Sequence, residues 1–193
     1  MPTGVTIRGV RAQLFGAADR ILLRDGPSAL TSRAVTTEAG VAKGVLHRHF
    51  DDFDAFLAEF VLDRVERMDA QAAALREAAG TGNVVDNLTD ALTALFESVA
   101  VAVVALVTFR DELRARLRDV WPAGVPVLTE AAIMVGTYLA VERDLGRIPA
   151  DADVDTLAAM LIGSTHLLFA DRATTPDTSA VRKVVATLVR PEP

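Results

Sequence analysis

The sequence has no cysteine among its 193 residues. This absence excludes disulfides, thiolate metal sites and cysteine nucleophiles. It also has no long apolar run. The longest uncharged stretches, Ser98–Phe109 and Thr156–Ala170, are shorter than the roughly 18–20 residues of a membrane-spanning helix. No apolar segment follows a basic start at the N-terminus, so we expect no secretory signal and no membrane partner. These absences together predict a soluble protein of the cytoplasm.

Catalytic motifs are missing as well. There is no phosphate-binding loop, nucleophile elbow or dinucleotide fingerprint. His47 and His49, followed by Asp51 and Asp52, resemble a metal motif only superficially, because residues two apart on a helix point about 200° apart. We therefore expect no enzyme, no cofactor and no metal site.

Charge is distributed unevenly along the chain. Residues 1–50 hold seven basic and three acidic residues, a balance of +4. The remaining residues hold 13 basic and 23 acidic residues, a balance of −10. A basic end on an acidic body is typical of a nucleic-acid reader with a separate second domain, although a segment of this size can also reach such a balance by chance.

Apolar residues recur at helical spacing along the whole chain, and no stretch alternates as a strand would. Breaks come where glycine and proline cluster, first at Asp25-Gly26-Pro27. The chain is predicted to be all-α with eight to nine helices. The expected helices are 8–24, two short ones within 30–50, a long one from 51 to about 79, and then 84–107, 109–119, 126–145, 153–171 and 177–189.

The stretch from Leu30 to Phe50 has the layout of a helix-turn-helix. Thr31 can cap its first helix, Leu30 and Val35 are placed as a hydrophobic staple, and Gly40 lies where a helix stop needs a positive φ. In the second helix Val41, Leu46 and Phe50 are spaced to turn inward, which leaves Lys43, Val45, His47 and Arg48 on or near the outside. In this motif the second helix enters a DNA major groove.

With these residues in view, the chain resembles the TetR family of bacterial transcriptional repressors, most densely over residues 11–57. The resemblance includes the apolar spacing of helix one, the Gly26 break, Ala39-Gly40-Val41 at the turn, and His49-Phe50. A looser match runs from Tyr138 to Ile148. The resemblance of the N-terminal part implies DNA contacts from Thr31, Ser32 and Arg33 and, in the major groove, from Lys43, Gly44, Val45 and Arg48. It also implies a contact from His47, which replaces a tyrosine that bonds a phosphate.

The sequence departs from the family pattern at four positions. Ala42 replaces a capping serine, Thr36 a small packing residue, His47 the tyrosine, and Phe53 a lysine that meets a phosphate. Phe53 also lies among Asp51, Asp52 and Asp54, which would repel a nearby phosphate. We expect weaker or more salt-sensitive DNA binding than the family norm. His47 is either a neutral donor that fits beside the phosphate or, because a phosphate favours the protonated imidazole, a group through which affinity rises as pH falls.

The resemblance implies two domains: a helix-turn-helix DNA-binding domain, residues 1–51, and an effector-binding and dimerisation domain, residues 52–193. The middle helices supply largely apolar residues that either fill the core or line a pocket. Our candidate ligand-binding residues are Phe96, Phe109, Trp121, Met134, Tyr138 and His166. His166 lies among leucines and fits a core or interface as well as a ligand contact.

The last two helices either close the monomer core or meet a second copy as a four-helix bundle. A helix-turn-helix protein usually reads two half-sites of DNA, and this favours the homodimer. We therefore predict a regulator, most simply a repressor, that binds a palindromic double-stranded DNA operator as a dimer and is released by a small hydrophobic effector. The alternative is an all-α ligand-binding or scaffold dimer whose DNA-binding head has degenerated, motivated by Ala42, His47 and Phe53.

Overall fold

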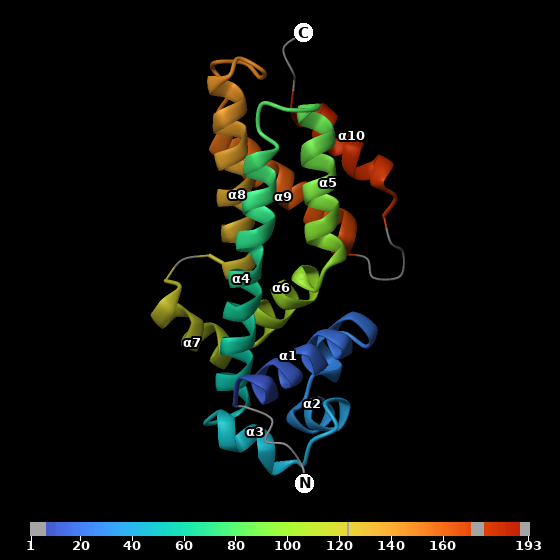
Figure 1. The fold of residues 1–193 in the computed structure, drawn as a ribbon, viewed down its shortest axis with the longest axis vertical. Coiled ribbons are helices and arrows are strands. Elements are labelled where there is room, and N and C mark those ends of the chain that lie inside the picture. The colour runs from blue at the N-terminus through green and yellow to red at the C-terminus, as the bar shows by residue number, and fades with distance from the viewer. Residues whose placement is uncertain (1–6, 123, 171–175, 190–193) are drawn as a thin grey trace. The chain divides into compact units, whose positions relative to one another are not determined.

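The computed structural model describes residues 7–122, 124–170 and 176–189, and the elements within these ranges are all helical (Figure 1). The all-α prediction is confirmed. The helices are α1 (Ile7–Arg24), the 3₁₀ turn η1 (Pro27–Ala29), α2 (Ser32–Glu38), α3 (Gly44–His49), α4 (Phe53–Glu77), α5 (Val84–Glu97), α6 (Ala100–Phe109), α7 (Asp111–Val120), α8 (Pro126–Asp144), α9 (Val154–Ala170) and α10 (Thr178–Leu188).

The described ranges hold ten α-helices, where eight or nine were expected, because the predicted helix 84–107 is two helices. The break falls at Ser98, whose backbone is extended (ψ −173°). Its hydroxyl bonds back to the Leu95 carbonyl and accepts the Ala100 N–H at 3.2 Å. Serine side chains compete with the helix for backbone hydrogen bonds in this way, which an apolar spacing pattern does not reveal.

The chain divides into two compact units. The first holds residues up to 63 together with 102–123, and so contains α1 to α3, the start of α4, most of α6 and all of α7. The second holds residues 64–101 and 124 onward, with the rest of α4, α5, α8, α9 and α10. The residues expected to form the DNA-binding domain, 1–51, all belong to the first unit.

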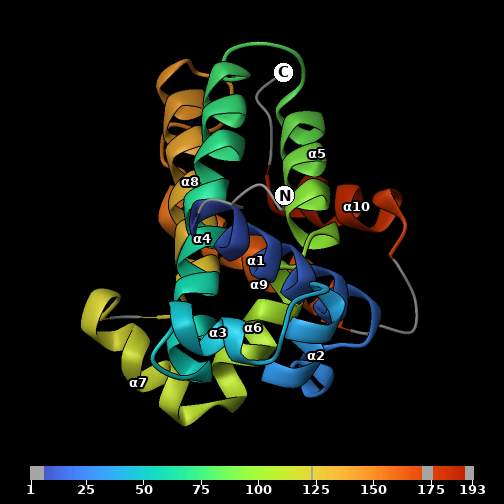
Figure 2. The ribbon, with the colours of Figure 1, turned by 60° about the horizontal axis from the view of Figure 1, so that its bottom comes forward.

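The core of the first unit is a cluster of phenylalanines. Phe15 of α1 lies 6.0 Å from Phe50 and 5.6 Å from Phe56, measured between ring centroids, and Phe60 completes the group at 5.8 Å from Phe15. All four are at most 6% exposed. Figure 2 brings α1 to the front, with α2 and α3 beside it. This cluster ties the end of α3 to α1 and to the start of α4.

In the second unit α8 packs on α9, and α10 packs on both α5 and α9 (Figure 1). Phe96 of α5 stacks on Phe169 of α9 at 5.8 Å, and the buried face of α10 is carried by Val181 and Val185. Among the described residues no single helix has the length and apolar composition to span a membrane. Within these residues, α5 and α6 together have that length and composition, but the chain bends by 55° between them.

Candidate nucleic-acid interface

The first helix of the motif, α2, is capped and stapled as its sequence predicts. The Thr31 hydroxyl accepts the Ala34 N–H at 3.1 Å, and Leu30 and Val35 are both buried. Thr36 is 2% exposed, and its hydroxyl donates within α2 to the carbonyls of Ser32 and Arg33. A polar side chain thus fills the packing position without leaving its hydroxyl unpaired.

The turn between the two helices depends on Gly40, whose φ is +67°. Its N–H donates to the Thr37 carbonyl, and the Val41 N–H donates to the Thr36 carbonyl, each at 3.0 Å. This is how a helix ends with a left-handed residue, a conformation that costs glycine little. The expected positive φ at Gly40 is confirmed.

The second helix, α3, faces its apolar residues inward and its charges outward. Leu46 and Phe50 are buried, and Val41 and Val45 are half-buried. Lys43, Gly44, His47 and Arg48 are exposed. The N-cap residue of α3 is Lys43, and its side chain makes no capping hydrogen bond. A Cβ on Gly44 would meet nothing within 4 Å, so the protein surface is open there.

Two side chains of α1 hold the motif in place. The Arg11 guanidinium lies 4.5 Å from the centre of the Phe50 ring, donates to the His49 carbonyl at 3.2 Å and pairs with Glu59 of α4. Gln13 donates to the Ala39 carbonyl at 2.7 Å. Arg11 therefore positions the C-terminal end of α3, and Gln13 positions that of α2.

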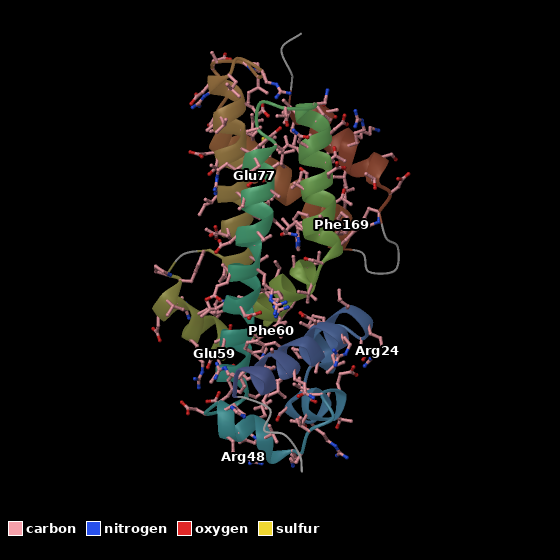
Figure 3. The ribbon with its side chains drawn as sticks, viewed as in Figure 1. Arg24, Arg48, Glu59, Phe60, Glu77 and Phe169 are labelled. Carbon is pink, nitrogen blue, oxygen red and sulfur yellow. The ribbon has the colours of Figure 1, made fainter. Side chains whose placement is uncertain are left out.

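The basic residues of the first 50 positions whose side chains the structure describes divide into paired and unpaired groups. Arg20 and Arg24 both bond to Glu38, and Arg11 pairs with Glu59. Their charges are balanced by carboxylates of the protein itself. Within the part of the chain that the structure describes, no ion pair is made by Arg33, Lys43 or Arg48, all of which are exposed. Figure 3 shows Arg48 on α3, well apart from Arg24 at the end of α1.

The remaining predicted DNA contacts differ in how available they are. Thr31 and His47 are exposed. Ser32 is half-buried, and its hydroxyl oxygen lies in the interior with no hydrogen-bond partner in the described ranges. Among the predicted contacts, the side chains of Thr31, Arg33, Lys43, His47 and Arg48 therefore lie at the surface, whereas the hydroxyl of Ser32 does not.

Sequence reasoning assigned no function to residues 110–118, yet two arginines there reach the start of α4. Arg110 pairs with Asp54 at 2.7 Å, and Arg116 pairs with Asp52. Phe53 stacks on Phe56 at 5.6 Å, with the Arg110 guanidinium 5.6 Å from its ring centre. The Ala55 N–H, and after it the Arg116 charge, lower the pKa of Asp52. The only feature of the sequence that could have predicted these ion pairs is the acidic run at Asp51, Asp52 and Asp54, which calls for nearby positive charge.

The candidate ligand residues are not all brought together. Phe96 and His166 are neighbours, with ring centroids 5.9 Å apart, and burial lowers the His166 pKa. Met134 and Tyr138 line a separate groove of about 280 Å³ between α4 and α8. Phe109 and Trp121 belong to the first unit, where Phe109 is 85% exposed and Trp121 half-buried. The other lining residues of the groove are Asp69, Ala72, Arg76, Glu130, Ile133 and Thr137.

A buried polar network lies beside this groove. Glu142 is fully buried; its carboxylate accepts the Gly80 N–H at 3.1 Å and pairs with Arg147 at 3.2 Å. Asn87 donates to the Tyr138 hydroxyl at 3.1 Å, and burial raises the pKa of that hydroxyl. No group of three or more metal-ligating side chains gathers anywhere in the described residues.

Residues 14–60 match the family model described as bacterial regulatory proteins, tetR family. No curated protein matches the chain. Among solved structures, reduced E. coli NemR is similar with a TM-score of 0.73 at 13% identity, over 94% of this chain and 97% of that one. A TetR-family transcriptional regulator from Agrobacterium tumefaciens gives 0.72 at 10%, over 94% and 96%.

A further similar structure is FadR from Bacillus subtilis, a transcriptional regulator solved in complex with stearoyl-CoA. Its TM-score is 0.67 at 16% identity, over 92% of this chain and 97% of that one. At such identities these likenesses establish the fold, while the family model identifies the helix-turn-helix within it. Over residues 14–60 the chain therefore carries the helix-turn-helix of the tetR family of bacterial regulatory proteins, and its overall fold is that of the similar structures.

Proposed function

We propose that this protein is a ligand-responsive repressor that binds a palindromic operator as a homodimer and releases it when a small hydrophobic effector binds. The observation that carries the proposal is the set of exposed cations on the motif, Arg33, Lys43 and Arg48, which have no ion-pair partner among the described residues. Arginine and lysine can pair with the O6 and N7 edge of guanine, and either can bind phosphate.

The test is selection of bound sequences from random duplex DNA at low salt, where phosphate contacts are strongest. We expect a palindromic site. Lys43→Ala and Arg48→Ala should each weaken binding to it by about 1–3 kcal/mol if the side chain reads a base. Arg118→Ala, which removes an exposed arginine of α7 that makes no described ion pair, is the matched control and should bind as the wild type does.

Failure of the wild type to enrich any sequence would favour the alternative, a ligand-binding or scaffold dimer with a degenerate head. The gathering of these exposed cations on the helix-turn-helix argues against that alternative. A protein that acts on an operator must also reach the chromosome, so we place its function in the cytoplasm.

For the effector we propose the second unit, where Phe96 and His166 are adjacent and Met134 and Tyr138 line a groove. The B. subtilis FadR structure carries stearoyl-CoA, so acyl thioesters belong in the first ligand screen.

Helix α4 contributes residues to both units, and its 25 residues make it about 38 Å long at 1.5 Å per residue. We infer that the effector acts by changing the separation of the two recognition helices, which must match half-sites about 34–36 Å apart.

A further inference from the structure

The acidic run after the recognition helix creates an electrostatic problem for DNA binding. Asp51, Asp52 and Asp54 follow α3 directly. The Cα of Asp52 lies no more than about 14 Å from the Cα of Arg48, since an extended chain spans at most about 3.6 Å per residue. The screening length is about 10 Å in 0.1 M salt and about 30 Å in 0.01 M salt, so a free carboxylate this close to the recognition helix repels the phosphate backbone of bound DNA most strongly at low salt.

Two of the three acids are neutralised by residues far along the sequence. Arg110 pairs with Asp54 across 56 positions, and Arg116 pairs with Asp52 across 64. The two arginines approach α4 from α7 and from the residue that precedes it, within the first unit. Arg110 also covers the Phe53 ring. Asp51 is exposed and makes no ion pair within the described ranges.

Resting on the proposed function, we propose that Arg110 and Arg116 are positioning residues for DNA binding. They act by neutralising Asp54 and Asp52, so that the negative charge beside α3 does not oppose the approach of the phosphate backbone. DNA affinity therefore depends on α7, an element outside the helix-turn-helix. The dependence is local to one side of α7, because Arg118 is two residues beyond Arg116 and points about 200° away from it.

The experiment measures the dissociation constant of the selected duplex by fluorescence anisotropy between 50 and 200 mM salt. The variants are Arg116→Gln, Asp52→Asn, the double variant and Arg118→Gln. Asparagine at position 52 keeps the cap on the Ala55 N–H, since asparagine caps helices as well as aspartate does. Thermal unfolding of each variant checks that it is folded, and Arg110→Gln with Asp54→Asn repeats the cycle at the second pair.

We expect Arg116→Gln to weaken binding roughly three- to tenfold at 50 mM salt, with the loss shrinking at 200 mM. The double variant should return to within about twofold of the wild type, because the local charge is again balanced. Arg118→Gln should remain within about twofold. If the double variant stays weak and its salt slope stays lower by about 0.9, Arg116 contacts a phosphate directly and the proposal is wrong.

An equal loss in Arg118→Gln and Arg116→Gln would also overturn it, because net charge alone would then explain the effect. These failures leave the proposed function standing, since the wild type still binds its site. If the wild type binds no duplex, the proposed function fails and the inference fails with it.

Discussion

Glu38 is a carboxylate of α2 that ties this helix to two arginines of α1. It accepts from Arg20 at 2.7 Å and from Arg24 at 3.2 Å. Hydrogen bonds from Arg20 and then Arg24 lower its pKa below the ordinary value of 4.5. A carboxylate with a lowered folded-state pKa stabilises the fold fully above its unfolded value, and this contribution is lost as pH falls through the lowered value.

We predict that Glu38→Gln lowers the free energy of unfolding at neutral pH and flattens its decline between about pH 5 and pH 3. Urea denaturation at several pH values measures both effects. Glu97→Gln is the control, because Glu97 is exposed and has no ion pair within the described residues, and its curve should run parallel to that of the wild type. Curves for Glu38→Gln that stay parallel to the wild type down to pH 3 would contradict the prediction.

At the scale of elements, features that depend on neighbouring residues could be predicted from the sequence, and contacts between distant residues could not. The Thr31 cap and the Gly40 stop depend on neighbouring residues, so the boundaries of α2 could be predicted closely. The prediction of one helix over 84–107 was wrong. The helix ends before Ser98, because the Ser98 hydroxyl bonds to the Leu95 carbonyl. The ion pairs of Arg110 and Arg116 could not be predicted, since their partners lie 56 and 64 positions away.

Glu142 joins three elements of the second unit, and its removal should be costly. Its carboxylate bonds to the N–H of Gly80 in the α4–α5 connection and to Arg147 beyond the end of α8. Arg147 in turn donates to the Gly82 carbonyl at 2.6 Å. Glu142 is fully buried, but Arg147 is 26% exposed and keeps its bond to Gly82, so we predict that Glu142→Gln destabilises the protein by about 1.5–3 kcal/mol.

Chemical denaturation measures this loss. Asp144→Asn is the matched control on the same helix, because Asp144 pairs with Arg143 at the surface, at 3.5 Å, where such pairs contribute less than about 1 kcal/mol. Equal effects of the two substitutions would mean that Glu142 does not anchor the connection.

At the scale of the whole molecule, α9 carries apolar side chains, Met160 and Leu167, that are exposed at the surface of the protomer. Ala158, Leu161 and Thr165 of α9 are buried, so this side of the helix packs into the core of its own protomer, one of the two outcomes expected for the last two helices. Met160 and Leu167, however, are 46% and 75% exposed. Gly163 lies between them, and a Cβ there would meet nothing within 4 Å. Spaced at three and four residues, these positions share one face of the helix.

A second copy of the chain is the occupant that fits the proposed function, since a palindromic site needs two recognition helices. A twofold axis places each residue of the contact on both sides, so one substitution is felt twice. We predict that Leu167→Glu shifts the protein to a monomer and weakens operator binding, with a dimer dissociation constant raised roughly 30-fold if the two copies of the leucine together contribute about 2 kcal/mol. Leu145→Glu changes a leucine that is 56% exposed at the end of α8 and should leave the dimer intact. Light scattering coupled to size exclusion measures the mass of each variant. A wild type that is already monomeric at micromolar concentration would refute the dimer, because Met160 and Leu167 would then have no partner to cover them.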